Sequence, residues 1–281
     1  MPVTLPDGLI KAVRNRKCVL FVGSGLSTLA GYPNWGQLID RLVFEARRNP
    51  RARTEGLEAI EARGDYLTLA EFARETLQPW GYTEILKEEF GRPLAPTAAH
   101  RLIAATDYRG IVTTNYDRLL ELALTQVRGV VPNTFSHDSV SSIGAALYNP
   151  ELFLFKMHGD LSSPASIVLS TRDYERLILF SPHVRALMMG LFLNCKLLFV
   201  GYGLRDPDFS LILRELTLSF ENYVPQHYAL FPNPGQFEQD HLQRQMNIQL
   251  IGYDPADDHR EVLDVLQELH DIAPAPLPLA A

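Results

Sequence analysis

Cysteine is scarce in this sequence. The 281 residues include two cysteines, so the chain cannot build a four-cysteine zinc site. Cys18 and Cys195 each stand inside an apolar run, KCVLFVG and NCKLLFV, which favours buried thiols over a disulfide or metal ligands. We therefore expect the functional site of this chain to contain no metal.

Long apolar runs and an excess of positive charge are also missing. No apolar run approaches the roughly 20 residues that a membrane span needs, and the start, MPVTLPDGLIKAVRNRK, lacks the apolar core of a secretory signal. The formal net charge of −7 disfavours direct nucleic-acid binding, because such surfaces usually carry clustered Lys and Arg. We expect a cytoplasmic protein that binds neither membranes nor nucleic acids.

Apolar runs of strand length recur along the chain, separated by amphipathic stretches. We expect strands at residues 18–22, 110–113, 152–157, 167–169, 197–200, 227–231 and 248–251. Continuous apolar runs suit strands buried on both faces, and their alternation with helices favours a mainly parallel sheet. The sequence thus predicts an α/β fold, a single doubly wound Rossmann-like domain over residues 1–281.

One segment interrupts this alternation. Residues 37–97 are rich in Ala, Leu, Glu and Arg at helical spacing and include no convincing strand. The flanking stretches GYPNW and GRPLAP have the composition of turns. We predict a helical insertion here, directly after the first glycine-rich turn, and a disordered tail at residues 273–281, APAPLPLAA.

The first motif that could carry chemistry is VLFVGSGLS, residues 19–27, an apolar strand that runs into a glycine-rich turn. Gly23 and Gly25 would let the backbone approach a pyrophosphate, although a tight turn without a ligand explains them equally well. Thr28 replaces the third glycine of the dehydrogenase fingerprint, and no GK[ST] follows. Hydride transfer and phosphoryl transfer are therefore disfavoured.

Polar side chains follow two further strands. GIVTTNYDRLLE places Asn115 and Asp117 at the carboxyl edge of the expected sheet, and FLFKMHGDL places His158 there. Ligands of open α/β sheets bind at this edge, and a histidine can exchange a proton near neutral pH. The plainer alternatives are a helix cap at Asn115 or Asp117 and a structural role for His158.

The fourth motif, LLFVGYGLRDPDF, repeats the pattern of an apolar strand followed by glycines. Gly201 and Gly203 could approach a nucleotide, or could form an ordinary turn with Asp206 as helix cap and Pro207 at the first helical position. Four strand ends with small, polar or titratable residues would together form a nucleotide-binding crevice.

In this order the four motifs resemble the SIR2-like family, specifically the bacterial antiphage-defence branch of NADases. HRLIAATDYRGIVTTNYD, IVLSTRDYE and NIQLIGYD resemble that branch too, so the resemblance spans nearly the whole chain. It implies that NAD is the substrate and that the bond between nicotinamide and ribose is hydrolysed, giving nicotinamide and ADP-ribose.

The resemblance also implies a role for each matching residue. Asn115 would hold the nicotinamide ribose and the attacking water, Asp117 would contact the nicotinamide amide, and His158 would act as general base. The remaining positions would bind other parts of NAD. They are Gly23, Ser24, Gly25 and Ser27 for the pyrophosphate, Gly201, Tyr202 and Gly203 for the adenosine, and Asn34, Trp35, Thr114 and Asp206 as further contacts.

The sequence departs from protein-deacylating sirtuins at two points. Those proteins carry a four-cysteine zinc ribbon beyond the histidine, and nothing equivalent follows His158. Their PDFR motif is here PNWGQ, with Asn34 and Trp35 in place of the acidic and aromatic pair. An NAD-dependent protein deacylase is therefore the second hypothesis, and a non-catalytic module that binds ADP-ribose or another nucleotide is the third.

Control of the activity is a further expectation. The branch that the chain resembles couples such a domain to a ligand sensor, an Argonaute-like protein or a helicase-like ATPase. Because the expected domain occupies the whole sequence, we expect a separate defence partner or a homo-oligomer to gate the enzyme. The helical insertion, which begins beside the phosphate turn, would then act as a lid.

Overall fold

The computed structural model describes residues 3–149, 151–204, 207–220 and 223–276. In these residues seven strands form one sheet in the order β3-β4-β2-β1-β5-β6-β7, and every paired neighbour runs parallel. The strands are β1 (Cys18–Val22), β2 (Gly110–Thr113), β3 (Asn133–Ser136), β4 (Phe153–Lys156), β5 (Lys196–Val200), β6 (His227–Pro232) and β7 (Ile248–Tyr253). The doubly wound, Rossmann-like fold predicted from the sequence is confirmed.

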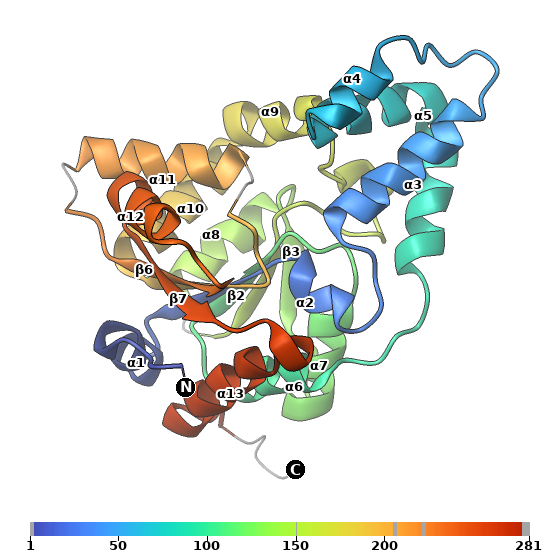
Figure 1. Ribbon diagram of the computed structural model, residues 1–281. Coiled ribbons are helices and arrows are strands. Elements are labelled where there is room, and N and C mark those ends of the chain that lie inside the picture. Colours follow the sequence, from blue (N-terminus) through green and yellow to red (C-terminus); the bar gives the residue numbers. More distant parts are fainter. Residues whose placement is uncertain (1–2, 150, 205–206, 221–222, 277–281) are drawn as a thin grey trace.

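Helices cover both faces of the sheet (Figure 1). One face carries α1 (Asp7–Arg14), α6 (Ala98–Ala105), α7 (Leu119–Arg128) and α13 (Ala256–Ile272). The other carries α8 (Val140–Tyr148), α9 (Thr171–Phe180), α10 (Pro182–Asn194), α11 (Pro207–Ser219) and α12 (Gln236–Met246). Strand β1 shows why two layers form, because Val19 and Phe21 enter one core while Leu20 and Val22 enter the other.

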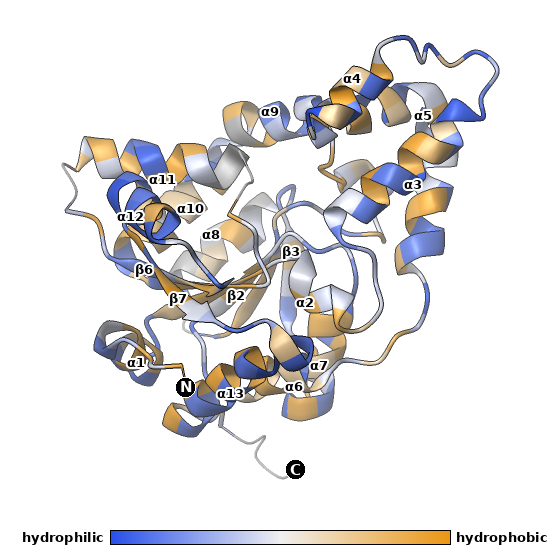
Figure 2. Ribbon diagram, viewed as in Figure 1, coloured by the Kyte–Doolittle hydropathy of each residue, from blue (hydrophilic) through white to orange (hydrophobic). Residues whose placement is uncertain are grey.

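The hydropathy of the elements follows this layering. In Figure 2 the strands are mostly hydrophobic, whereas α13 alternates between hydrophobic and hydrophilic residues. Helix α13 buries Val262, Val265, Leu266 and Leu269, which recur at helical spacing. In the described part of the chain no single helix is long and apolar enough to cross a membrane; only the bent pair Thr171–Leu177 and Pro182–Asn194 passes that test jointly.

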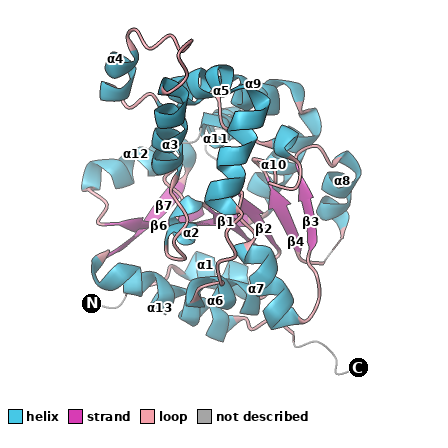
Figure 3. Cartoon of the chain, turned by 90° about the vertical axis from the view of Figure 1, so that its right-hand side faces the viewer, coloured by secondary structure: helices cyan, strands magenta, loops and turns pink. Residues whose placement is uncertain are grey.

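The segment predicted as an insertion at residues 37–97 consists of α3 (Trp35–Arg47), α4 (Leu57–Ala62) and α5 (Tyr66–Phe90), which follow the short helix α2 (Ser24–Thr28). Helix α5 breaks at Gln78, whose φ is 59°, before Pro79. The insertion stands at one end of the sheet, away from α1, α6 and α13 (Figures 1 and 3). It has a hydrophobic core of its own, shared with Tyr116 and Leu119 of the sheet domain.

Three local expectations need correction. Residues 167–169 form no strand; they are buried beside the 3-10 turn Pro164–Ser166, and packing rather than sheet pairing explains their apolar character. Strand β3 was not expected, because it is a mostly polar edge strand. Of the predicted disordered tail, residues 273–276 are ordered by the Thr106–Pro274 bridge and by a 2.7 Å bond from Ala275 N to Ala105 O, while residues 277–281 lie outside the described chain.

Candidate active site

A cavity of about 850 Å³ lies at the carboxyl ends of β1, β2, β4 and β5. These strands flank the point where successive connections turn to opposite sides of the sheet, which is where open α/β sheets bind ligands. Most of the positions predicted from the sequence line this crevice. They are Ser24, Ser27, Asn34, Trp35, Thr114, Asn115, Asp117, His158, Gly201, Tyr202 and Gly203.

Gly23 and Gly25 lie behind the cavity wall, where the turn after β1 meets the turn after β5. A Cβ on Gly23 would stand 2.4 Å from the Gly201 carbonyl oxygen, and one on Gly201, whose φ is +62°, would stand 2.5 Å from Leu26 N. The Gly25 amide donates to the Gly201 oxygen at 2.9 Å. These glycines are therefore required by the contact between the two turns, and their proximity to a pyrophosphate stays a prediction. Asp206 lies outside the described residues.

Asn115 follows β2 and is 7% exposed. Its Nδ2 donates to the Gly23 carbonyl oxygen at 3.0 Å and to Ser27 Oγ at 2.8 Å. Because a carbonyl oxygen only accepts, these bonds fix which end of the amide is the nitrogen. The remaining atom, Oδ1, is buried without a hydrogen-bond partner among the described residues. The side chain thus offers one free acceptor in the wall of the crevice.

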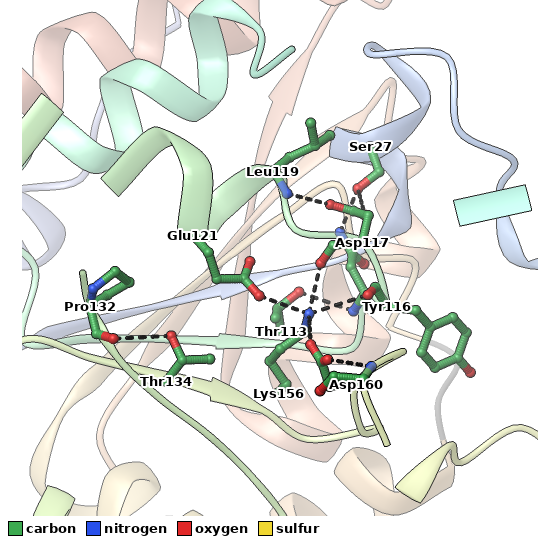
Figure 4. A network of polar contacts seen from close by, with 12 residues as sticks. Ser27, Thr113, Tyr116, Asp117, Leu119, Glu121, Pro132, Thr134, Lys156 and Asp160 are labelled. Carbon is green, nitrogen blue, oxygen red and sulfur yellow. Dashed lines mark hydrogen bonds and ion pairs between the residues drawn. The ribbon is translucent and has the colours of Figure 1, made fainter. Parts of the chain in front are cut away.

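Asp117 continues this chain of hydrogen bonds (Figure 4). Its Oδ2 accepts from Ser27 Oγ at 2.6 Å, and its Oδ1 accepts from Leu119 N at 2.9 Å, at the start of α7. Asp117 is not itself the cap residue of α7, because it precedes the N-cap residue Arg118 and bonds the first residue of the helix. The same carboxylate also holds Ser27, and through Ser27 it orients the Asn115 amide. Contact with a nicotinamide amide stays a prediction.

His158 sits in the turn after β4, and its ring meets the ring of Tyr174 edge-on at 5.0 Å. Its backbone oxygen accepts from Val168 N at 3.0 Å, so the buried 167–169 segment supports this turn. Gly159 adopts a φ of +89°, and a Cβ there would stand 2.1 Å from the Ser166 carbonyl oxygen. The glycine after the histidine is thus a requirement of this backbone.

Several lining residues were not found by sequence reasoning. Residues 63–67, which comprise the turn between α4 and α5 and the first two residues of α5, line the crevice, and Tyr66 meets Trp35 edge-on at 5.5 Å. Arg63 contributes a positive charge to the lining, and Asp65 and Asp117 contribute negative ones. The local sequence of this segment matches no motif, so only the packing of the insertion reveals its position.

The described residues contain no group of three or more His, Cys, Asp or Glu side chains that could hold a metal ion. What they bring together is an amide with a free acceptor atom, an imidazole and a short serine–aspartate chain, at the ends of three neighbouring strands. Such a set can orient a water molecule or a sugar hydroxyl and accept its proton.

Comparison with known proteins now decides the family. A family profile described as a SIR2-like domain matches residues 109–251, half of the chain, a region that includes Asn115, Asp117, His158 and Gly201. The chain belongs to the SIR2-like domain family. The resemblance seen in the sequence motifs is confirmed.

Curated relatives of this SIR2-like domain are longer proteins. It is 30% identical over 227 residues to the NAD(+) hydrolase ThsA of Acinetobacter baumannii, covering 80% of this chain and 44% of the relative. It is 27% identical over 277 residues to the NAD(+) hydrolase ThsA of Bacillus cereus (93% and 55%), and 26% identical over 238 residues to the defense-associated sirtuin 2 of Bacillus subtilis (83% and 22%). The chain therefore spans about half or less of each of these relatives.

Proposed function

We propose that this SIR2-like chain hydrolyses NAD at the bond between nicotinamide and ribose, giving nicotinamide and ADP-ribose. The observation that carries the proposal is the state of Asn115, whose Nδ2 is used by Gly23 and Ser27 while Oδ1 has no partner among the described residues. A buried, unpaired acceptor normally costs free energy, so its presence in a crevice wall indicates a ligand that donates to it.

The proposed reaction breaks one bond and forms one. The glycosidic bond to nicotinamide breaks, nicotinamide leaves with the electron pair, and positive charge develops on the ribose. The oxygen of a water molecule then bonds to the same ribose carbon. Asn115 Oδ1 accepts a hydrogen bond from the water or from a ribose hydroxyl, and His158 takes the proton that the water loses. The residue roles predicted from the sequence fit this scheme.

Asp117 has a supporting part in this proposal. Both of its carboxylate oxygens accept hydrogen bonds, from Ser27 Oγ and from Leu119 N, and the side chain is 4% exposed. It keeps the Ser27 hydroxyl proton directed away from Asn115, so that the Ser27 oxygen accepts from Asn115 Nδ2. Its edge facing the crevice would contact the nicotinamide amide.

The names of the relatives support a proposal for the biological role, since two are named NAD(+) hydrolase and one defense-associated sirtuin. We infer a cytoplasmic, NAD-depleting effector of antiphage defence. Uncontrolled hydrolysis would deprive the cell of NAD, so assembly into a homo-oligomer or a separate defence partner would gate it. The insertion, which contributes residues 63–67 to the crevice, would act as the lid.

The decisive experiment incubates the purified chain with NAD and separates the products by chromatography, with and without an acylated peptide. Nicotinamide and ADP-ribose formed without peptide support the hydrolase. A strict requirement for peptide supports a protein deacylase, and ADP-ribose binding without turnover supports a non-catalytic module.

Gating is tested on the same preparation. Turnover per molecule is measured over a wide range of protein concentration, with size-exclusion profiles in parallel. We expect specific activity to rise as larger species form or as a candidate partner is added. Full specific activity in a strictly monomeric sample, unchanged by any partner, would contradict this part of the proposal.

A further inference from the structure

Lys156, the last residue of β4, is buried behind the crevice and does not line it. Its side chain is 1% exposed. Its Nζ donates to the backbone oxygens of Tyr116 and Asp117 at 3.2 and 2.8 Å, and to the carboxylates of Glu121 and Asp160 at 2.9 and 2.5 Å (Figure 4). An ammonium group has three protons, so these four acceptors use all of the hydrogen bonds that Lys156 Nζ can donate.

Lys156 is ionised and firmly paired. Burial by itself lowers the pKa of Lys156, but the carboxylates of Glu121 and Asp160 outweigh it and raise the pKa above its usual value. Burial likewise raises the pKa of Asp160, but Lys156 more than compensates, so that this pKa lies below its usual value. Glu121 is more deeply buried, and there burial prevails and the pKa is raised.

Stability alone is a poor reason for such a group. Removing an ammonium group and carboxylates from water costs about as much free energy as their ion pairing recovers. An apolar side chain of similar volume often stabilises a core equally well. What an apolar side chain could not do is hold two backbone carbonyls in place. The unusual feature of Lys156 is therefore its pair of bonds to Tyr116 and Asp117.

Those two carbonyls belong to the loop that carries Asn115. Lys156 itself stands two residues before His158, and it lies opposite Thr113 in the parallel pairing of β2 with β4. One ammonium group thus connects the strand end that bears the amide with the strand end that bears the imidazole. The bonds of the loop to Gly23 and Ser27 lead to the segment after β1. On the other side, Tyr116 Oη donates to the Val168 oxygen at 2.6 Å, and Lys156 supplies the bonds that reach the end of β4 directly.

We propose that Lys156 is a positioning residue, which holds residues 115–117 in fixed relation to His158. The inference rests on the proposed NAD hydrolysis for its catalytic meaning, but its structural content stands apart from it. Without Lys156 the loop would lose its direct side-chain bonds to β4, and Asn115 Oδ1 would sample orientations in which it cannot hold the water or ribose hydroxyl beside His158.

The test compares Lys156→Met combined with Glu121→Gln against Glu121→Gln alone. The double variant removes the bonds of Lys156 Nζ to the Tyr116 and Asp117 carbonyls. Because Glu121 is also replaced by an uncharged residue, Asp160 is the one carboxylate of this cluster that loses its ammonium partner. The single variant keeps Lys156 and its carbonyl bonds and loses one ion pair. Amide hydrogen exchange of residues 114–119 is followed by mass spectrometry, and kcat and KM for NAD are measured alongside.

We expect faster exchange at residues 114–119 in the double variant, and a fall in kcat of about 10- to 100-fold with KM changed less than about threefold. In Glu121→Gln we expect a lower melting temperature with exchange and kcat close to wild type. A residue that only stabilises the fold would lower the melting temperature without changing kcat per folded molecule. Unchanged loop exchange in the folded double variant overturns the proposal.

Two measurements on wild-type protein keep the outcomes distinct. If the double variant does not fold, native-state exchange of the wild type decides, because a loop held by Lys156 should open only together with β4. Opening of residues 114–119 while β4 stays protected would overturn the proposal. Absence of NAD turnover in the wild type under every condition contradicts the proposed function, and the exchange data then judge the positioning role by themselves.

Discussion

Asn115 is held by two groups of the segment that follows β1, the Gly23 carbonyl and the Ser27 hydroxyl. A single side chain can therefore be removed to test the site without removing a packed core residue. Replacing Asn115 or His158 by Ala should reduce NAD cleavage by at least about 100-fold while costing about 1–3 kcal/mol of stability, because Asn115 loses two hydrogen bonds and His158 loses its ring contact with Tyr174.

Matched controls for these substitutions lie outside the crevice. Asn194→Ala removes an amide on the surface of α10, and His241→Ala removes an imidazole on α12. Turnover and thermal melting are measured for all four variants. Wild-type turnover in folded Asn115→Ala or His158→Ala would remove that residue from the proposed mechanism.

The glycines after β5 give a second prediction at the residue scale. Gly201→Ala combines a left-handed φ with a Cβ 2.5 Å from Leu26 N, so we expect it to cost about 2 kcal/mol or more. At Gly203 no atom lies within 4 Å of the added Cβ and φ is not left-handed, so Ala should change the free energy of unfolding by less than about 0.5 kcal/mol. Urea denaturation of the two variants checks the contrast, and equal losses would contradict the interlocked turns.

At the scale of elements, the insertion is tied to the sheet domain through α5 and α9. Arg74 of α5 pairs with Asp173, which is 7% exposed and also accepts from Ser170 N at the start of α9. Arg74→Met leaves this carboxylate without its cation, so we expect a loss of about 1–3 kcal/mol. The control is Arg260→Met on α13, whose pair with Asp264 is exposed on both sides and should contribute less than about 1 kcal/mol.

Denaturant unfolding of both variants tests this contact. Similar losses in the free energy of unfolding for Arg74→Met and Arg260→Met would show that the ion pair between α5 and α9 stabilises the protein no more than an exposed one. Helix α9 also carries Tyr174 against the His158 ring. The attachment of the insertion is therefore adjacent in structure to the proposed general base.

The elements also show what a sequence can and cannot predict. Apolar runs followed by small or polar residues predict strands β1, β2, β4 and β5. The same pattern predicts that Asn115, Asp117 and His158 lie at one edge of the sheet. Strand β3 is mostly polar, and it takes its place by pairing with β4 and by the packing of Phe135 on Phe155, which a local pattern does not report. The lining segment at residues 63–67 and the buried Lys156 depend on packing between segments far apart in sequence, which no local pattern reports.

At the scale of the whole molecule, buried histidines make stability depend on pH. Burial lowers the pKa of His100 to about 4, against the opposing effect of the Asp117 carboxylate, and lowers the pKa of His227 to about 3. Both values lie below the ordinary 6.5, so the unfolded chain binds protons first as the pH falls. The contribution of each neutral histidine is complete above about pH 6.5 and is lost progressively below it.

We expect the free energy of unfolding to fall by about 2 kcal/mol for each of these histidines between pH 7 and pH 5. His227→Asn keeps an acceptor for Leu197 N, which bonds His227 Nδ1 at 3.2 Å, and removes one titrating group. Urea titrations at several pH values should therefore show a shallower dependence in the variant. An unchanged slope would contradict the assignment to His227.

The contact between the turns after β1 and β5 has a consequence for the order in which the protein is made. The crevice needs Gly23 beside Gly201, and Asn115 reaches back 92 residues to its carbonyl partner. During translation, the turn after β5, which closes the crevice, is synthesised only after most strands of the sheet. On the proposed function, a nascent chain that ends before Gly201 cannot hydrolyse NAD, so the cell that synthesises the protein is spared its activity until the turn after β5 has been added.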